Sequence, residues 1–263
     1  MIELKDKIAW VTGAGTGIGE AAAVGLAREG AIVVLTGRRK EPLEAVARTI
    51  AAAGGRAHVQ PADLAKAADV SKVAQFIARE FGRLDLLVNN AGLNIPDRSW
   101  QRLQPEGIET VIDGNLTSAF FVAQAALPLM RPHGGGQMIH TASWAGRFIG
   151  PVSGPTYLAA KHGMVAMSHS LNLEECANGI RSTVLCPGEV ATPIMTERPI
   201  PETAESLARM VQPEDMGELI AFVAQQPPHV VINEVVVSPT HNRGYINQMK
   251  ARAAQAQAAG KTS

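Results

Sequence analysis

The chain has 263 residues, of which 46% are apolar, 18% charged and 4% aromatic. This composition is typical of a globular protein with a full core. Lysine and arginine number 24, as do aspartate and glutamate, so no basic excess favours a nucleic acid or a membrane surface as a partner. Charges near the start ("MIELKDK") and the lack of an apolar run of ~18 residues predict a cytoplasmic protein without a membrane span.

Short β-branched runs alternate with longer alanine-rich helical stretches along the whole chain. We predict strands at residues 8–12, 31–36, 57–60, 84–89, 136–141, 182–186 and 234–237. We predict helices at residues 17–29, 42–53, 70–81, 105–130, 155–177 and 213–225. Because apolar strands are separated by helices, we expect an α/β fold with a seven-stranded parallel sheet covered by helices on both faces. No break in composition divides the chain, so a single domain is expected over residues 1–245. Residues 246–263 form a tail that is either a helix or a mobile end.

A glycine-rich turn joins the first strand to the first helix. "WVTGAGTGIG" places Gly13, Gly15, Gly17 and Gly19 at this junction. Glycines there allow a tight turn and let backbone N–H groups approach a pyrophosphate at the positive end of a helix. A nucleotide-binding turn is therefore predicted, and a purely structural turn is the alternative.

The end of the second strand indicates which nucleotide is bound. An NAD site usually has an acidic residue there for the ribose 2′-hydroxyl, but "VVLTGRR" has Gly37 followed by Arg38 and Arg39. A guanidinium can pair with a 2′-phosphate through two hydrogen bonds. NADP(H) is therefore favoured and NAD(H) remains the alternative, since both arginines could instead begin a solvated helix.

"TYLAAKHG" carries a tyrosine and a lysine at i and i+4 of a predicted helix, Tyr157 and Lys161. These positions share one face, so the phenol and the ammonium should lie close together. By itself the pair could be a tyrosine beside a solvated lysine on the surface. The other motifs of the chain favour a catalytic pair.

Six motifs follow one another along the chain: "TGAGTGIG", "NNAG", "VIDGNLTSAF", "TASWAG", "YLAAK" and "CPGEVATPI". In these motifs and their order, the chain resembles the short-chain dehydrogenase/reductase family from about Lys7 to Val237. The resemblance implies a doubly wound fold of the Rossmann type and hydride transfer between a nicotinamide cofactor and a carbonyl/alcohol pair. Two predicted helical segments, "NLTSAFFVAQAALPLM" and "TYLAAKHGMVAMSHSL", are apolar or small nearly all round. Packing on a sheet needs only one apolar face, so we expect a homo-oligomer, a dimer or a tetramer.

The resemblance implies a catalytic set of Asn115, Ser143, Tyr157 and Lys161. Tyr157 would be the general acid/base, Ser143 would hydrogen-bond the reacting oxygen, and Lys161 would hold the cofactor's ribose. Asn115 would anchor a water that relays protons. A phenol titrates near ~10, and we expect Lys161 and the positive nicotinamide ring to lower that pKa. A protein that keeps the fold but lacks the chemistry is the alternative of another class.

The resemblance also implies a cofactor-binding set that includes Tyr157 and Lys161. Asp63 would lie beside the adenine, Asn89 and Gly92 would line its ribose, and Thr192 would bond the carboxamide; Asp63 could instead be an N-cap. The whole predicted set is Gly13, Gly15, Thr16, Gly17, Ile18, Gly19, Arg38, Arg39, Asp63, Leu64, Asn89, Ala91, Gly92, Tyr157, Lys161, Pro187, Gly188, Val190 and Thr192. Because Thr16 replaces the basic residue that many NADP-dependent relatives have in the turn, Arg38 would act largely alone.

The substrate itself is not predicted beyond a small organic molecule. The segment at about 188–212 is expected to cover the active site, with Trp144, Ile149 and Pro151 as walls of a largely apolar pocket. No metal site is predicted, since the histidines and cysteines lack ligand spacing. His140 and His162 are interpreted as structural, and Cys176 and Cys186 as small buried hydrophobes.

Overall fold

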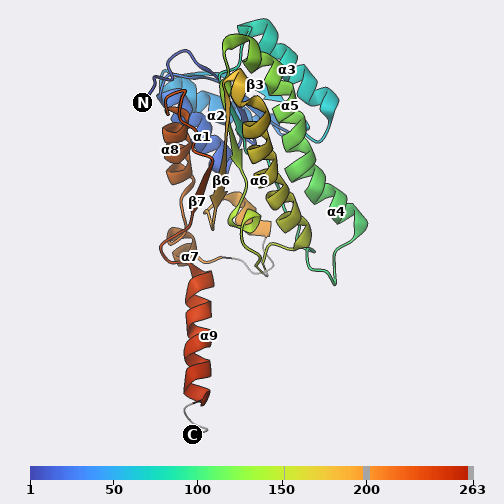
Figure 1. The fold of residues 1–263 in the computed structure, drawn as a ribbon, viewed down its shortest axis with the longest axis vertical. Helices are drawn as coiled ribbons and strands as arrows, with labels where there is room; N and C mark the ends of the chain where they lie inside the picture. The colour runs from blue at the N-terminus through green and yellow to red at the C-terminus, as the bar shows by residue number, and fades with distance from the viewer. Residues whose placement is uncertain (151, 198–201, 260–263) are drawn as a thin grey trace.

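A computed structural model describes residues 1–150, 152–197 and 202–259 (Figure 1). Its centre is one seven-stranded parallel sheet in the order β3-β2-β1-β4-β5-β6-β7. The strands are Ile8–Thr12, Ile32–Gly37, Arg56–Pro61, Leu86–Asn89, Gly136–Thr141, Ile180–Pro187 and Glu234–Val237, for β1 to β7. The predicted doubly wound α/β fold is confirmed, and every predicted strand lies within two residues of an observed one at both ends.

The helices cover both faces of this sheet, as Figure 1 shows. Apolar side chains of α1, α2 and α8 form one core layer, and those of α3 and α5 form the other, which α6 extends. The helices are α1 Gly17–Arg28, α2 Lys40–Ala52, α3 Ala67–Phe81, α4 Pro105–Ile112, α5 Ser118–Met130, α6 Pro155–Glu175, α7 Ala204–Ala208, α8 Pro213–Ala224 and α9 Arg243–Ala259. The strand order reverses beside β1, and ligands of such sheets bind at the carboxyl ends of the strands around this point.

Two helices differ from the prediction. The single helix expected over 105–130 is divided into α4, a π-helical turn Asp113–Thr117 and α5. Within the π-helical turn, the Asn115 side chain hydrogen-bonds the backbone of Leu93, which lies outside this helix. The tail forms α9, which begins at Arg243 and projects away from the sheet (Figure 1). Among the described helices, none has the length and hydropathy that a bilayer crossing requires.

Candidate active site

The glycine turn after β1 has the backbone that the sequence predicts. Gly13 and Gly17 have φ angles of +62° and +60°, a region that residues with a Cβ seldom occupy. A Cβ at Gly19 would lie 2.2 Å from the carbonyl oxygen of Gly13. Helix α1 begins at Gly17, and its N-cap, Thr16, makes no capping bond from its side chain. The turn is therefore a close-fitting cradle at the positive end of a helix, where anions bind.

The predicted adenine end lies at the surface beyond β2 and β3. Arg38 and Arg39 are exposed, and Arg39 is the N-cap of α2. Asp63 accepts a hydrogen bond from the backbone N–H of Ala65 (3.3 Å) and pairs with Lys66 at 3.5 Å. Since Lys66 is the N-cap of α3, Asp63 stabilises the preceding turn and does not cap the helix.

The two asparagines after β4 have different positions. Asn89 is buried, and its Nδ2 donates to the carbonyl of Ala119 on α5 (2.9 Å), so its side chain lies away from the cofactor side. Asn90 lines the cleft; its backbone N–H donates to Thr12 Oγ1 and its Nδ2 to the Thr12 carbonyl, at 2.9 and 3.2 Å. The sequence analysis assigned Asn89 and missed Asn90, although the motif "NNAG" contains both.

Asn115 lies in the π-helical turn and is fully buried. Its Nδ2 donates to the carbonyls of Leu93 and Val111, both at 2.8 Å, and its Oδ1 accepts from the N–H of Leu93 (3.3 Å). A Cβ on Gly92 would lie 2.7 Å from this Oδ1 and 3.3 Å from Lys161 Nζ. Asn115 therefore ties the turn after β4 to the helix beside the predicted catalytic lysine.

Ser143, Tyr157 and Lys161 come together at the carboxyl end of β5. Ser143 caps a short helix by accepting from the N–H of Ala145 (3.1 Å), and its side chain hydrogen-bonds Tyr157. Lys161 is 3% exposed; its Nζ donates to the Thr141 carbonyl (2.9 Å) and lies 5.5 Å from the centroid of the Tyr157 ring. The serine, tyrosine and lysine predicted as catalytic thus form one cluster.

Burial has the largest effect on the pKa of Tyr157 in the chain by itself. Burial raises this pKa above its ordinary value, and the hydrogen bond with Ser143 and the charge of Arg98 only partly oppose that. The chain alone therefore keeps Tyr157 protonated at neutral pH, in the form that can donate a proton to a carbonyl.

Burial lowers the pKa of Lys161 to about 8, which predicts a pH dependence of stability. Between that pH and ~10.4, the unfolded lysine binds a proton that the folded one lacks, so stability rises with pH. We expect the free energy of unfolding of the cofactor-free protein, relative to Lys161→Met, to rise by about 2 kcal/mol from pH 7 to 9.5. Urea unfolding of both proteins at the two pH values measures this; a constant difference would contradict the buried charge.

The loop after β6 completes the cleft. Pro187, Gly188, Val190 and Thr192 all line it. The Gly188 N–H donates to the Val237 carbonyl (2.6 Å), and Val190 forms a bridge with Val211. The contact of Gly188 with β7 and that of Val190 with Val211 hold this loop in place. The loop therefore lines the same cleft as Ser143, Tyr157 and Lys161.

These elements enclose an open cleft of about 1540 Å³, larger than the pocket of a typical small ligand and suited to a dinucleotide together with a substrate. The predicted cofactor residues that line it are Gly13, Thr16, Gly17, Ile18, Ala91, Gly92, Tyr157, Lys161, Pro187, Gly188, Val190 and Thr192. Those that do not are Gly15, Gly19, Arg38, Arg39, Asp63, Leu64 and Asn89. Gly15 and Gly19 shape the turn instead, approaching Pro42 and Gly13.

The substrate end of the cleft is more polar than predicted. Trp144 and Ile149 line it, as do the loop residues Pro193 and Met195; the predicted wall Pro151 lies outside the described residues. Further lining residues were not predicted, among them Arg98, Arg102, Arg147, Arg243 and Tyr245. Arg243 and Tyr245 follow the last strand, and no sequence pattern placed that segment beside the site.

The histidines and cysteines near the site have other positions. His140 is fully buried, and burial lowers its pKa to about 3; His162 is exposed and bonds the Leu158 carbonyl. Neither lines the cleft. Cys186 is buried as predicted, but Cys176 is exposed because it follows the end of α6. In the described ranges, no cluster of His, Cys, Asp or Glu is arranged to hold a metal ion.

Comparison with known proteins agrees with this geometry. A family model of short chain dehydrogenases matches residues 7–202. Cyclohexanol dehydrogenase of Acinetobacter sp. (strain SE19) is 35% identical over 223 residues, or 84% of this chain and 88% of the relative. An uncharacterized oxidoreductase of Staphylococcus aureus (strain MRSA252) is 35% identical over 91% of this chain and 100% of its own length.

Solved structures show the same fold. An alcohol dehydrogenase from the archaeon Thermococcus sibiricus, complexed with 5-hydroxy-NADP, has a TM-score of 0.82 and 26% identity, covering 91% of this chain and 99% of that one. A metagenomic short-chain oxidoreductase in complex with NADP has a TM-score of 0.79 and 32% identity, covering 90% and 99%. The chain belongs to the short-chain dehydrogenase/reductase family. It is an oxidoreductase of the NAD(P)-dependent class that acts on CH–OH and C=O groups.

Proposed function

We propose that the protein is an NADP(H)-dependent oxidoreductase that interconverts a carbonyl and a secondary alcohol of a small organic substrate. The observation that carries this proposal is the cluster of Ser143, Tyr157 and Lys161 in the same cleft as the glycine turn. The turn fits a dinucleotide, because its glycines allow a close backbone approach that a Cβ would prevent, and backbone N–H groups at the start of a helix bind phosphates. A nicotinamide cofactor, when bound, supplies or accepts the hydride.

Tyr157 carries the proton transfer in this proposal. During reduction its phenol donates a proton to the carbonyl oxygen, and during oxidation its phenolate accepts one from the hydroxyl. Ser143 holds the same oxygen by a second hydrogen bond. Lys161 provides positive charge beneath the ring and holds the cofactor's ribose. A water relay through Asn115 stays a prediction, because the side-chain bonds described above join it to backbone atoms.

The test is steady-state kinetics with NADPH and NADH over a panel of carbonyls, and with the oxidised cofactors over alcohols. Because the Acinetobacter relative is a cyclohexanol dehydrogenase, cyclohexanol and cyclohexanone belong at the head of the panel. We expect turnover of at least one cyclic or acyclic secondary alcohol or ketone. A protein that binds NADPH but turns over no member of the panel would favour the catalytically silent alternative.

The cofactor preference is proposed to depend on Arg38, which is exposed directly after β2. We expect Arg38→Ala to lower kcat/KM for NADPH by about 10- to 100-fold, since a charge-assisted pair is worth about 1.5–3 kcal/mol. NADH efficiency should change by less than threefold. Lys40→Ala is the control, because it removes an exposed charge nearby that pairs with Glu44 at 3.1 Å. Wild-type preference for NADH would contradict this assignment.

Exposed apolar side chains on two helices support assembly into an oligomer. Phe120 on α5 and Leu173 on α6 are 50% and 80% exposed. Their exposure supports a homodimer or a homotetramer that forms through these helices.

We propose a single domain that ends near residue 245, followed by a tail. A cytoplasmic location stays a prediction.

A further inference from the structure

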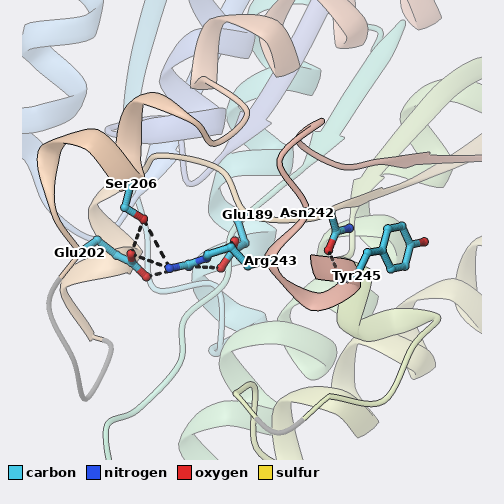
Figure 2. Close-up of polar contacts among 6 residues, drawn as sticks. All are labelled: Glu189, Glu202, Ser206, Asn242, Arg243 and Tyr245. Atoms are coloured by element: carbon cyan, nitrogen blue, oxygen red, sulfur yellow. Dashed lines mark hydrogen bonds and ion pairs between the residues drawn. The ribbon is translucent and has the colours of Figure 1, made fainter. Parts of the chain in front are cut away.

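One arginine, Arg243, joins three segments that lie far apart in the sequence (Figure 2). Its Nε donates to Glu189 Oε2 (2.8 Å), and its Nη2 donates to the other oxygen of Glu189. On the opposite side, Nη1 and Nη2 donate to Glu202 Oε2 and Oε1, at 2.9 and 2.8 Å. Ser206 Oγ donates to Glu202 (2.6 Å) and accepts from Nη1 (3.4 Å). A single guanidinium thus binds two carboxylates in a bidentate manner.

The positions of these residues give the cluster a direct relation to the substrate side of the cleft. Glu189 follows β6 at the start of the substrate loop, the segment at about 188–212, whereas Glu202 lies further along this loop and Ser206 lies in α7. Arg243 is the first residue of α9. The Glu202 side chain is 10% exposed and the Arg243 side chain 37%, so the network is partly shielded from water. Its strength therefore exceeds that of a fully exposed pair.

The first turn of α9 carries an aromatic ring to the cleft. Tyr245 lies two residues after Arg243, and its N–H donates to Asn242 Oδ1 (3.3 Å; Figure 2). Its ring meets that of Trp144 edge to face, with centroids 5.8 Å apart, and Trp144 in turn packs on Phe148 at 4.3 Å. All three rings line the cleft, and Trp144 is the neighbour of Ser143 in the chain.

We propose that Arg243 is a positioning residue that fastens the first turn of α9 to two points of the substrate loop, Glu189 and Glu202, and thereby holds Tyr245 against Trp144 as an aromatic wall. This wall selects substrates that carry an apolar ring beside the reacting carbon, because rings pack well on aromatic faces. The inference rests on the proposed function for the substrate, but the fastening itself can be measured without turnover. A lysine could not replace Arg243, because a point charge cannot form two bidentate pairs.

The first experiment is hydrogen–deuterium exchange of the full chain, comparing wild type with Arg243→Ala, Arg243→Lys and Arg252→Ala. Arg252 lies on the same helix and does not line the cleft. We expect faster exchange at residues 203–208 and 243–250 in both Arg243 variants, smaller for lysine, and unchanged exchange in β1 to β6. Arg252→Ala should match wild type. Unchanged exchange at both segments in Arg243→Ala would overturn the inference, whatever the enzyme's activity.

The second experiment compares cyclohexanol with 2-propanol as substrates of the same variants and of Tyr245→Ala. We expect Arg243→Ala and Tyr245→Ala to raise KM for cyclohexanol roughly tenfold, equivalent to about 1.4 kcal/mol. Their kcat, and KM for 2-propanol, should stay within about threefold. An equal KM rise for both alcohols, or a loss in kcat alone, would show a merely structural arginine and overturn the inference. If wild type oxidises neither alcohol, the same comparison is made in the reducing direction with cyclohexanone and acetone. Only a wild type that turns over no member of the carbonyl and alcohol panel contradicts the proposed function, and the exchange result decides the fastening independently.

Discussion

Tyr157→Phe is expected to lower kcat by about 10²- to 10⁴-fold, the range that general acid–base catalysis contributes. Phenylalanine keeps the ring above Lys161 but removes the hydroxyl, so no group remains to exchange a proton with the substrate oxygen. The chain's other tyrosine, Tyr245, lies at the substrate wall and does not contact Lys161 or Ser143. The loss should therefore appear in the chemical step and leave cofactor affinity nearly unchanged.

Two measurements accompany this variant. Fluorescence titration with NADPH should give a Kd within about threefold of wild type, and single-turnover kinetics should show the slowed step. His162→Ala is the control on the same helix, because His162 is exposed and does not line the cleft; its kcat should stay within about twofold. If Tyr157→Phe turns over within tenfold of wild type while NADPH still binds, Tyr157 is not the proton donor.

Gly19→Ala is expected to weaken NADPH binding by at least about 100-fold. The added Cβ would lie 2.2 Å from the Gly13 carbonyl oxygen and 2.6 Å from Asn90 Nδ2, so the turn must shift and its N–H groups leave their positions. An ordinary alanine substitution for a helical glycine would instead be stabilising, by up to ~1 kcal/mol. The effect therefore depends on the tertiary contact and opposes helix propensity.

Gly25→Ala is the matched control in the same helix, because its Cβ would approach the nearest atom, the Gly217 carbonyl oxygen, at 3.4 Å. We expect Gly25→Ala to bind NADPH as wild type does. Thermal unfolding monitored by circular dichroism separates a displaced turn from a loss of the fold. A folded Gly19→Ala that binds NADPH within threefold of wild type would contradict the proposed cradle.

Local patterns predicted most of the fold. The strands are continuous apolar runs, as expected where helices cover both faces of a sheet, and five of the six predicted helices were found with ends within three residues. The exception is the segment 105–130, whose composition is helical throughout. Its interruption at Asn115 depends on hydrogen bonds to Leu93, 22 residues away. The periodicity of a helical segment does not predict a contact with such a distant residue.

The sequence predicted which residues form the cluster in the cleft, but not the direction of every side chain around it. The tyrosine, lysine and serine were assigned from motifs and lie together. Side-chain direction was not predictable, however: of two adjacent asparagines, Asn89 bonds α5 and Asn90 lines the cleft. The predicted fall in the pKa of Tyr157 depends on a bound nicotinamide and stays a prediction. The sequence did not indicate that burial raises this pKa in the chain by itself, because burial depends on how the cleft closes around the ring.

The amino-acid sequence by itself determined the doubly wound fold, the glycine turn and which serine, tyrosine and lysine form the cluster in the cleft. These features are local: periodicity, short motifs and fixed spacings specify them. Only the tertiary structure decided how Arg243 meets Glu189 and Glu202, which are 54 and 41 residues away, and how Tyr245 meets Trp144. These contacts depend on the path of the chain after β7. The sequence does not indicate which distant residue a charged or aromatic side chain contacts, because that is decided only when the whole sheet is assembled.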